Sequence, residues 1–418
     1  MRGFFVFLAF SLCLFGQDQS LRNLLQSSKN NPLLEAKNFQ NKAALKEKQA
    51  LYSLYLPKVE VGYNAQRLQN PDIFYPKGVE GAYVDAKWLL FDGFKREGKL
   101  KMGDLKEKMS NLEALSTQEQ IHLEIIRGFY GVLTLEKKLE ALKAKEQELF
   151  QNSQKFNTLN LAGLAPKDTL EAIKAEFAKN SYEIEELKTI LIQAKENLSL
   201  LSGVVITKLQ EEKLKEVNQN LEAKERLDLQ ANLQKVKIKQ EEISQYNYLP
   251  TITLNNRYTN YHYQQRQIPL LPFSFKIEDP EYQNMFGINV SLVVFDSFGT
   301  HLQRESKRME HLAANSQYSY QKDKGQKERL VAEYALKSAK EKIQWAKQSL
   351  ESAKIAYLYA KDKFDAQLID YTQYLNALST YFGASSFYDE ARFSYEIKKA
   401  EFIYYSGENL EGFVKGIR

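Results

Sequence analysis

The sequence predicts an α+β membrane protein in which long helices and short strands occur in two similar halves. Three motifs of the first half recur in the second at a nearly constant separation. Tyr55–Pro57 recurs 193 residues later as Tyr248–Pro250, Phe91–Gly93 recurs 204 residues later as Phe295–Ser297, and Leu198–Gly203 recurs 204 residues later as Phe402–Gly407. Each half reads as a helix, two strands and two very long helices, which indicates an internal two-fold repeat.

The N-terminus has the pattern of a secretory signal peptide, which we assign to residues 1–16. Arg2 precedes an almost wholly apolar run from Phe4 to Phe15, which is shorter than the roughly 20 residues of a membrane-spanning helix. Cys13 is the only cysteine, and because Leu12 before it is not a small residue, we interpret Cys13 as part of the apolar run. We expect an exported protein with neither a disulfide nor a transmembrane helix.

Composition argues against several classes of function. The chain of 418 residues has 58 basic and 53 acidic side chains, and a net charge of +5 spread this evenly does not indicate nucleic-acid binding. The four histidines are far apart, and we expect His122 to be a packed or surface residue. The sequence contains no phosphate-binding glycine loop and no Cys/His cluster. It therefore predicts no enzyme, no cofactor and no metal site.

The first half covers residues 17–203. Its helical pattern runs from about Gln19 to Ser53 and stops at Pro57, where proline cannot continue a helix. A β-hairpin is expected over 57–91, because Val59, Val61 and Tyr63 alternate with polar residues. A long helical hairpin is expected over 95–202, with its tip near 161–168. An apolar heptad seam supports it: Val132, Leu135, Leu139, Leu142, Leu149 and Phe156.

The second half covers residues 225–407 and follows a connector, 204–224, that shows no clear period. Its helix stops at Pro250, and a β-hairpin is expected over 250–295, with Leu292 and Val294 continuing the alternation of its second strand. A helical hairpin over 299–405 has its tip near 365–372. Residues 408–418 read as a C-terminal tail.

The strands have the length and the two-sided pattern of membrane-spanning β-strands. Long polar loops at 66–81 and 264–284 join them. Their tyrosines suit an aromatic girdle at the membrane surface, or reflect strand propensity alone: Tyr75, Tyr258, Tyr261 and Tyr263. A small hairpin packed on a soluble core is the alternative to the membrane assignment.

Four strands cannot close a barrel, and lipid cannot satisfy an open strand edge. Bacterial barrels begin at eight strands, so several chains must share one barrel, and three chains would supply twelve strands. The same three chains would supply twelve long helices, which is enough for a tube. A signal peptide, a shared barrel and a helical tube together describe a conduit.

The order and spacing of these motifs resemble those of the TolC-like outer membrane efflux proteins over nearly all of the mature chain. The matching elements are Asn31–Ala36, both Tyr-Leu-Pro motifs, both Phe-Asp exits, Gly163–Ala165 and Leu198–Gly203. The resemblance implies a homotrimer with a 12-stranded barrel in outer membrane lipid, continuous with a periplasmic α-helical barrel. It also implies a periplasmic membrane-fusion adaptor and an inner membrane pump as partners.

The resemblance implies three groups of functional residues. Gly163, Leu164, Gln367 and Leu368 would form the tips that receive the adaptor, although Gln367 stands where the family usually has glycine. Asp370, Gln373 and Asn376 would line the pore constriction, where some family members carry two aspartates three residues apart. Gln373 and Asn376 are neutral, so we expect Tyr371 and Tyr374 to help close the pore by packing and hydrogen bonds. The chain would enter and leave the barrel at Pro57, Phe91, Asp92, Pro250, Phe295 and Asp296.

Two further classes remain open at this stage. An exported coiled-coil scaffold without a pore would explain the helices but not the strand pairs, and a passive porin would need many more strands in one chain. Within the conduit class, multidrug efflux, metal efflux and type I protein secretion share one architecture.

Overall fold

The computed structural model describes residues 19–69, 76–218, 221–263 and 280–414. The expected signal peptide with Cys13, and also Tyr75, lie outside these ranges. The chain divides into two compact units. The helical unit comprises Met1–Lys37, Ala114–Leu227 and Lys322–Arg418, and the strand unit comprises Asn38–Glu113 and Asp228–Gln321.

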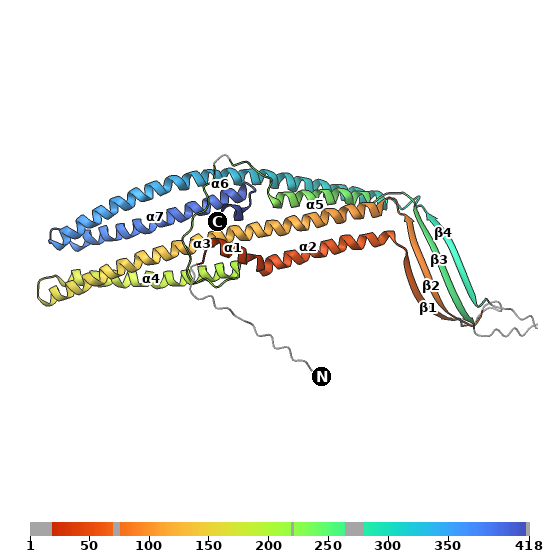
Figure 1. The fold of residues 1–418 in the computed structure, drawn as a ribbon, viewed down its shortest axis with the longest axis horizontal. Coiled ribbons are helices and arrows are strands. Elements are labelled where there is room, and N and C mark those ends of the chain that lie inside the picture. The colour runs from red at the N-terminus through yellow and green to blue at the C-terminus, as the bar shows by residue number, and fades with distance from the viewer. Residues whose placement is uncertain (1–18, 70–75, 219–220, 264–279, 415–418) are drawn as a thin grey trace, which may run out of the picture. The chain divides into compact units, whose positions relative to one another are not determined.

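Long helices and a small antiparallel sheet make up the fold, which confirms that part of the prediction (Figure 1). None of the described helices is both long and apolar enough to cross a membrane. The elements in chain order are α1 Leu21–Ser27, α2 Pro32–Leu51, β1 Lys58–Arg67, β2 Gly78–Phe91, α3 Lys95–Leu161, α4 Lys167–Ser202, α5 Leu227–Ser244, β3 Thr251–Tyr263, β4 Tyr282–Ser291, α6 Gly299–Asp365 and α7 Tyr371–Tyr405, with short 3-10 helices at Ser28–Asn30, Tyr52–Tyr55 and Leu410–Phe413.

The four strands form one antiparallel sheet in the order β1-β2-β3-β4. Each hairpin pairs within itself, and β2 also pairs with β3, so the two halves of the chain contribute to one sheet. Among the described residues, β1 and β4 each pair with a single neighbour and leave an open edge.

The sheet has one apolar and one polar face. One row across all four strands shows the apolar face, because Val59 lies opposite Ala86, Ala86 opposite Asn256, and Asn256 opposite Phe286. Val59 is 62% exposed and Phe286 is 65% exposed. The opposite face carries the polar residues and is hollowed, with a depression of about 310 Å³ that spans all four strands. Alternation of side chains along each strand produces this division.

Two of the tyrosines assigned to the aromatic girdle lie on the polar face of the sheet. Tyr261 lines the polar hollow, and Tyr263, two residues further along β3, stacks on it with ring centroids 5.5 Å apart. Tyr258 lies on the apolar face as expected and stacks on Tyr282 at 6.0 Å. Because strand side chains alternate, three residues of separation place Tyr258 and Tyr261 on opposite faces.

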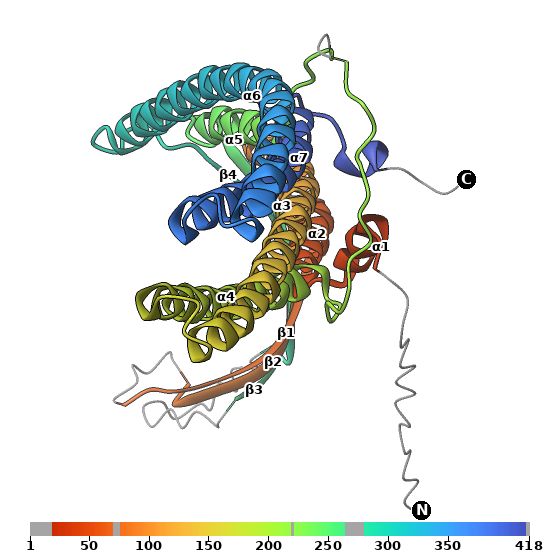
Figure 2. The ribbon, with the colours of Figure 1, turned by 90° about the vertical axis from the view of Figure 1, so that its left-hand side faces the viewer.

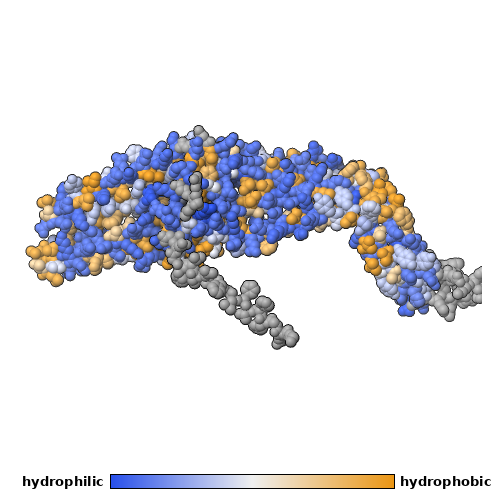
Figure 3. Space-filling view, in the orientation of Figure 1, coloured by the Kyte–Doolittle hydropathy of each residue, from blue (hydrophilic) through white to orange (hydrophobic). Residues whose placement is uncertain are grey.

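The last strand is shorter than the sequence pattern indicated. β4 ends at Ser291, which lies opposite Thr251, the first residue of β3. Pro250 precedes Thr251 and has no N–H to extend the ladder. Leu292 and Val294 therefore continue the apolar run beyond the paired strand, where they are 56% and 86% exposed. Figure 3 shows hydrophobic residues gathered over this end of the sheet.

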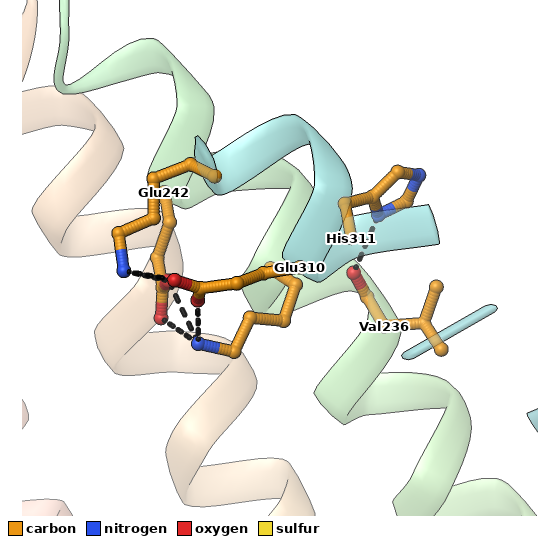
Figure 4. Close-up of polar contacts among 6 residues, drawn as sticks. Val236, Glu242, Glu310 and His311 are labelled. Carbon is orange, nitrogen blue, oxygen red and sulfur yellow. Dashed lines mark hydrogen bonds and ion pairs between the residues drawn. The ribbon is translucent and has the colours of Figure 1, made fainter. Parts of the chain in front are cut away.

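Ion pairs fasten the short helix α5 to the start of α6 in the strand unit (Figure 4). Lys239 Nζ lies 2.9 Å from both Glu242 and Glu310, and Lys307 Nζ lies 2.8 Å from Glu310. In the first half, Lys48 on α2 makes the corresponding contact with α3, at 2.7 Å from Glu107. These groups are partly exposed, so solvent screens each pair and its contribution to stability is small.

The helical unit consists mainly of two helical hairpins. Figures 1 and 2 show α4 running back along α3 and α7 running back along α6. The predicted heptad seam packs as expected, since Val132 and Leu149 are fully buried. Phe129 and Tyr130 on α3 form one apolar core with residues of α4 and α7.

The first helix is broken in two, although the sequence pattern predicts a single helix from about Gln19 to Ser53. α1 ends before Asn31, and α2 begins at Pro32. Proline is favourable at the first position of a helix, and the Asn31 side chain accepts the Leu33 N–H at 2.8 Å. The same side chain donates to Leu201 O at 3.0 Å, which fixes the break against the end of α4.

The segment interpreted as a connector and the C-terminal tail both contribute to the core. Leu209 and Leu214 of the connector are 5% and 2% exposed, and Leu410 of the tail is fully buried. A parallel β-bridge joins Gln19 to Leu209. Neither segment shows a long helical or strand period, because the connector is mostly extended chain that buries single side chains and the described part of the tail forms only the short 3-10 helix Leu410–Phe413.

A buried lysine ties the connector to α7. Lys399 is fully buried, and its ammonium lies 3.1 Å from Glu396 and 3.1 Å from Glu216. The Glu396 carboxylate also accepts the Leu214 N–H at 2.9 Å. Burial raises the pKa of Glu396, and Lys399 opposes that shift.

We predict that Lys399→Ala destabilises the helical unit by about 3–5 kcal/mol, because it leaves the buried Glu396 without its counter-ion. Lys398→Ala is the matched control, since Lys398 is more than a third exposed in its pair with Glu401 and should cost about 1 kcal/mol or less. Thermal unfolding followed by far-ultraviolet circular dichroism measures both. Equal shifts in the two variants would contradict a structural role for the buried pair.

Candidate functional site

The residues expected where the chain enters and leaves the sheet lie in the strand unit, and the tip and constriction residues lie in the helical unit. The two exits from the sheet have the same backbone construction. At each exit, a phenylalanine and an aspartate are followed by two residues with positive φ, namely Gly93 (72°) and Phe94 (65°) in the first half, and Ser297 (53°) and Phe298 (67°) in the second. Two left-handed residues in succession redirect the chain from strand to helix. Phe91 packs edge-on against Phe94, and Phe295 against Phe298.

The exit aspartates cap the long helices. Asp92 Oδ2 accepts the Arg96 N–H at 3.0 Å, and Asp296 Oδ2 accepts the Thr300 N–H at 2.7 Å. Each carboxylate thereby satisfies an N–H group that has no partner within the first turn of α3 or α6. Hydrogen bonds from Thr300, first from its side chain and then from its backbone N–H, lower the pKa of Asp296.

Arg96 holds the exit of the first hairpin together, and the sequence pattern did not indicate it. Its guanidinium donates to Leu89 O at 2.7 Å, to Leu90 O at 2.9 Å and to Leu54 O at 3.2 Å, and it lies 4.5 Å from the Tyr55 ring. It joins the chain before β1 to the end of β2 and the start of α3. The second half has Thr300 at the corresponding position, so comparison of the two halves did not indicate a role for Arg96.

The two prolines mark where the chain enters the sheet. Pro57 lies directly before β1, and Pro250 directly before β3. Neither proline contributes an N–H to the ladder, so strand pairing starts at the residue after each proline.

The first helix tip is a tight turn with an open surface. Gly163 has φ 74°, and Leu164 N–H donates to Leu159 O at 2.8 Å, which closes the end of α3. A Cβ added at Gly163 would meet no atom within 4 Å. Leu161 and Leu164 are 81% and 71% exposed. The tip therefore presents two leucines beside a position that has free space for a partner.

The second tip adopts the same turn, even though glycine is absent. Gln367 has φ 60°, and Leu368 N–H donates to Lys363 O at 2.8 Å. Leu368 is 73% exposed. The backbone geometry of the turn is the same with glutamine as with glycine. Glutamine makes the turn less favourable, because a side chain in the left-handed φ region is strained by about 1–2 kcal/mol.

Polar contacts and stacked rings join the two hairpins near their tips. Lys361 Nζ lies 2.7 Å from Glu148, and Tyr374 Oη donates to the same carboxylate at 2.8 Å. Lys155 Nζ lies 2.7 Å from Asp365. Burial alone would raise the pKa of Glu148, but the hydrogen bonds from Lys361 and Tyr374 hold it below its usual value.

The expected constriction residues are exposed, but the tyrosines beside them are not. Asp370 caps α7, where its Oδ1 accepts the Gln373 N–H at 2.8 Å. Gln373 and Asn376 are exposed on the next turns of α7. Tyr371 and Tyr374, which we expected to help close the pore, are 6% and 1% exposed and pack within the chain's own core. Their separation of three residues places both on the buried face of α7.

His122 is a packed residue, as the sequence suggested. It is fully buried, both ring nitrogens lack a hydrogen-bond partner, and burial lowers the pKa of its imidazole. The nearest acidic group is Glu119, at 3.8 Å. Across the described ranges, no group of acidic, histidine or cysteine side chains is arranged to hold a metal ion.

Residues 218–403 match the sequence model of the outer membrane efflux protein family, which confirms the resemblance predicted from the motifs. That family consists of transport channels rather than enzymes. No curated protein sequence matches the chain.

Several solved outer membrane channels have the same fold. The CmeC channel of Campylobacter jejuni is 16% identical, with 95% of this chain and 86% of that chain covered and a TM-score of 0.81. VceC of Vibrio cholerae is 14% identical, with 93% and 96% covered and a TM-score of 0.81. The open state of MtrE of Neisseria gonorrhoeae is 12% identical, with 93% and 89% covered and a TM-score of 0.78. Identities this low establish the fold alone.

We predict that Gln367→Gly raises the free energy of unfolding by about 1 kcal/mol, because it relieves a left-handed side-chain conformation. Gln373→Gly, the same substitution within α7, should lower it by about 1 kcal/mol. Thermal unfolding of the purified variants measures both changes. A loss of stability in both would show that the Gln367 side chain contributes more than its strained backbone costs.

Proposed function

From the family match of residues 218–403, we propose that the chain is an outer membrane channel that serves as the exit duct of a tripartite efflux or secretion system. It receives cargo from an inner membrane pump through a periplasmic adaptor and releases it outside the cell. The strands lie in the outer membrane, the loops 66–81 and 264–284 face outward, and the long helices lie in the periplasm. The observation that carries this proposal is the two-sided sheet with two open edges.

The sheet supports a barrel shared by three chains. Its exposed apolar face suits lipid, and its hollowed polar face suits a water-filled lumen. Lipid offers no hydrogen bonds to the open edges of β1 and β4, so each edge needs a strand of another chain. Three copies of four strands give a closed barrel of twelve.

Backbone geometry supports the two-fold repeat. Eight residues of the described chain have positive φ values in the left-handed region, and they form four pairs separated by 204 residues. The pairs are Gly93 with Ser297, Phe94 with Phe298, Gly163 with Gln367, and Gly203 with Gly407. Duplication of one ancestral half explains why turns of the same kind occur at the same positions in each half.

Both helix tips supply the surface for the adaptor. The tips share one turn geometry and present Leu164 and Leu368 to solvent at 71% and 73% exposure. At the first tip Leu161 and Leu164 are exposed close together, and neighbouring exposed apolar side chains suit contact with a partner. Gly163 adds space for close approach of a partner backbone.

The constriction of the duct is formed by α7, at Asp370, Gln373 and Asn376. All three are exposed, and Gln373 and Asn376 carry no charge. Asp370 is the one acid among the three, and its carboxylate is engaged as the cap of α7. This arrangement gives a constriction with little negative charge.

A coiled-coil scaffold without a pore is a weaker explanation. It would account for α3 and α6, each 67 residues long, but a scaffold has no use for an exposed apolar sheet face opposite a polar hollow. Metal efflux and type I protein secretion use the same kind of duct, and the pump then selects the cargo.

We predict that cysteines on the edge strands cross-link three chains. The pair Val59→Cys and Phe286→Cys lies in one row of the sheet, on β1 and β4, and Cys13, the one natural cysteine, lies in the expected signal peptide. A flexible bis-maleimide should give a ladder on a denaturing gel that ends at the trimer, because β1 of one chain meets β4 of the next.

The control pair is Ala86→Cys with Asn256→Cys, which lies in the same row on the inner strands β2 and β3. It should link only within one chain and give monomers. A ladder that stops at dimers, or continues past three chains, would refute the shared barrel of twelve strands.

We predict that Leu164→Asp and Leu368→Asp each abolish capture of the cognate adaptor while trimers still form, because a charge placed in an apolar contact must lose its hydration. Leu200→Asp is the matched control, since Leu200 is 75% exposed and lies at the other end of α4. Pull-down with immobilised adaptor and gel migration of unheated trimers measure the two properties. Normal capture by both tip variants would place the docking surface elsewhere.

A further inference from the structure

A stacked arrangement of three residues crosses the polar hollow of the sheet. The Tyr83 ring lies over Gly62, where an added Cβ would clash with the ring. The Arg257 guanidinium lies 4.1 Å from the centre of the same ring. Glycine on β1 thus gives space for a tyrosine on β2, and the tyrosine positions an arginine from β3. An arginine held on an aromatic face keeps its charge at a fixed place on the surface.

The other charged residues of this face pair with each other. Lys58 lies 3.6 Å from Glu60, and Lys87 lies 3.4 Å from Asp85. Each pair joins residues two apart on one strand, so both members project from the same face. These four charges cancel.

Arg257 is the remaining charge of the polar face in the described strands. It lies opposite Asp85 in the strand register, yet the Asp85 carboxylate pairs with Lys87, and the Arg257 guanidinium lies over Tyr83 instead. Asp85 is also largely covered, with its side chain 11% exposed, whereas that of Lys87 is 62% exposed. On the polar face of the described strands, the charge of Arg257 is therefore the one that the two ion pairs leave over, and Arg257 lines the hollow.

We infer that Arg257 gives the barrel a preference for anionic solutes, and this inference rests on the proposed duct. Three chains place three Arg257 side chains around one lumen. A ring of like charges in a narrow, low-dielectric passage concentrates the opposite ion. At the proposed constriction Gln373 and Asn376 carry no charge, and the carboxylate of Asp370 is engaged as the cap of α7.

The test is the reversal potential of single channels in planar bilayers under a potassium chloride gradient. At about 0.1 M salt, where charges act over roughly 10 Å, the unaltered protein should favour chloride over potassium at least about twofold. Arg257→Gln should bring the permeability ratio to about one, and Arg257→Glu should reverse it. Arg257→Lys should keep the sign.

Two control variants separate Arg257 from charge in general. Arg67→Gln removes the same charge from the opposite face of the sheet, because its neighbour Gln66 lines the hollow, and it should leave the ratio unchanged. Asp370→Asn removes the acid of the constriction and should change the ratio less than Arg257→Gln. Unheated gel migration and the size of the conductance steps confirm that each variant assembles.

The outcomes distinguish the inference from the proposed function. Failure of the unaltered chain to give any conductance steps would overturn the duct and the inference together. Steps that favour potassium, or a chloride preference that survives Arg257→Gln, would overturn the inference and leave the duct intact. Chloride preference lost in Arg257→Gln and kept in Arg67→Gln supports it.

Discussion

The unpaired backbone at the two edges of the sheet is the constraint on which the rest of the molecule depends. β1 and β4 each have one paired and one open side, while their exposed apolar residues suit a lipid environment that offers no hydrogen bonds. In the proposed duct, strands of further chains satisfy these edges. The polar hollow follows from the alternation of side chains, because an apolar face on one side of the sheet leaves the other side for polar side chains.

Left-handed turns occur at corresponding positions in both halves of the chain. Glycine occupies these turns in the first half at positions 93, 163 and 203, whereas the second half keeps glycine only at position 407. Ser297 and Gln367 adopt the same φ region at a conformational cost. Local hydrogen bonds hold these turns, as Leu368 N–H to Lys363 O does at the second tip.

Charge is distributed differently in the two units. In the helical unit, buried lysines have carboxylate partners on other segments of the chain, as Lys399 has with Glu216 and Lys145 with Glu176. In the strand unit, Arg257 has an aromatic platform in place of an acid. Pairing stabilises the helices, whereas Arg257 keeps its positive charge in the hollow, and the inferred anion preference depends on that charge.

The sequence alone determined the number and order of the long helices and strands, because period-two and heptad patterns depend only on local geometry. It also located both tips and the capping aspartates Asp92 and Asp296. Tertiary structure decided what those patterns leave open. The break at Asn31 depends on a carbonyl group at the end of α4. The burial of Leu209 and Leu410 depends on helices that are distant from them in sequence. The faces of Tyr261 and Tyr374, and the stack of Gly62, Tyr83 and Arg257, depend on strand register and helix packing, which no single segment contains.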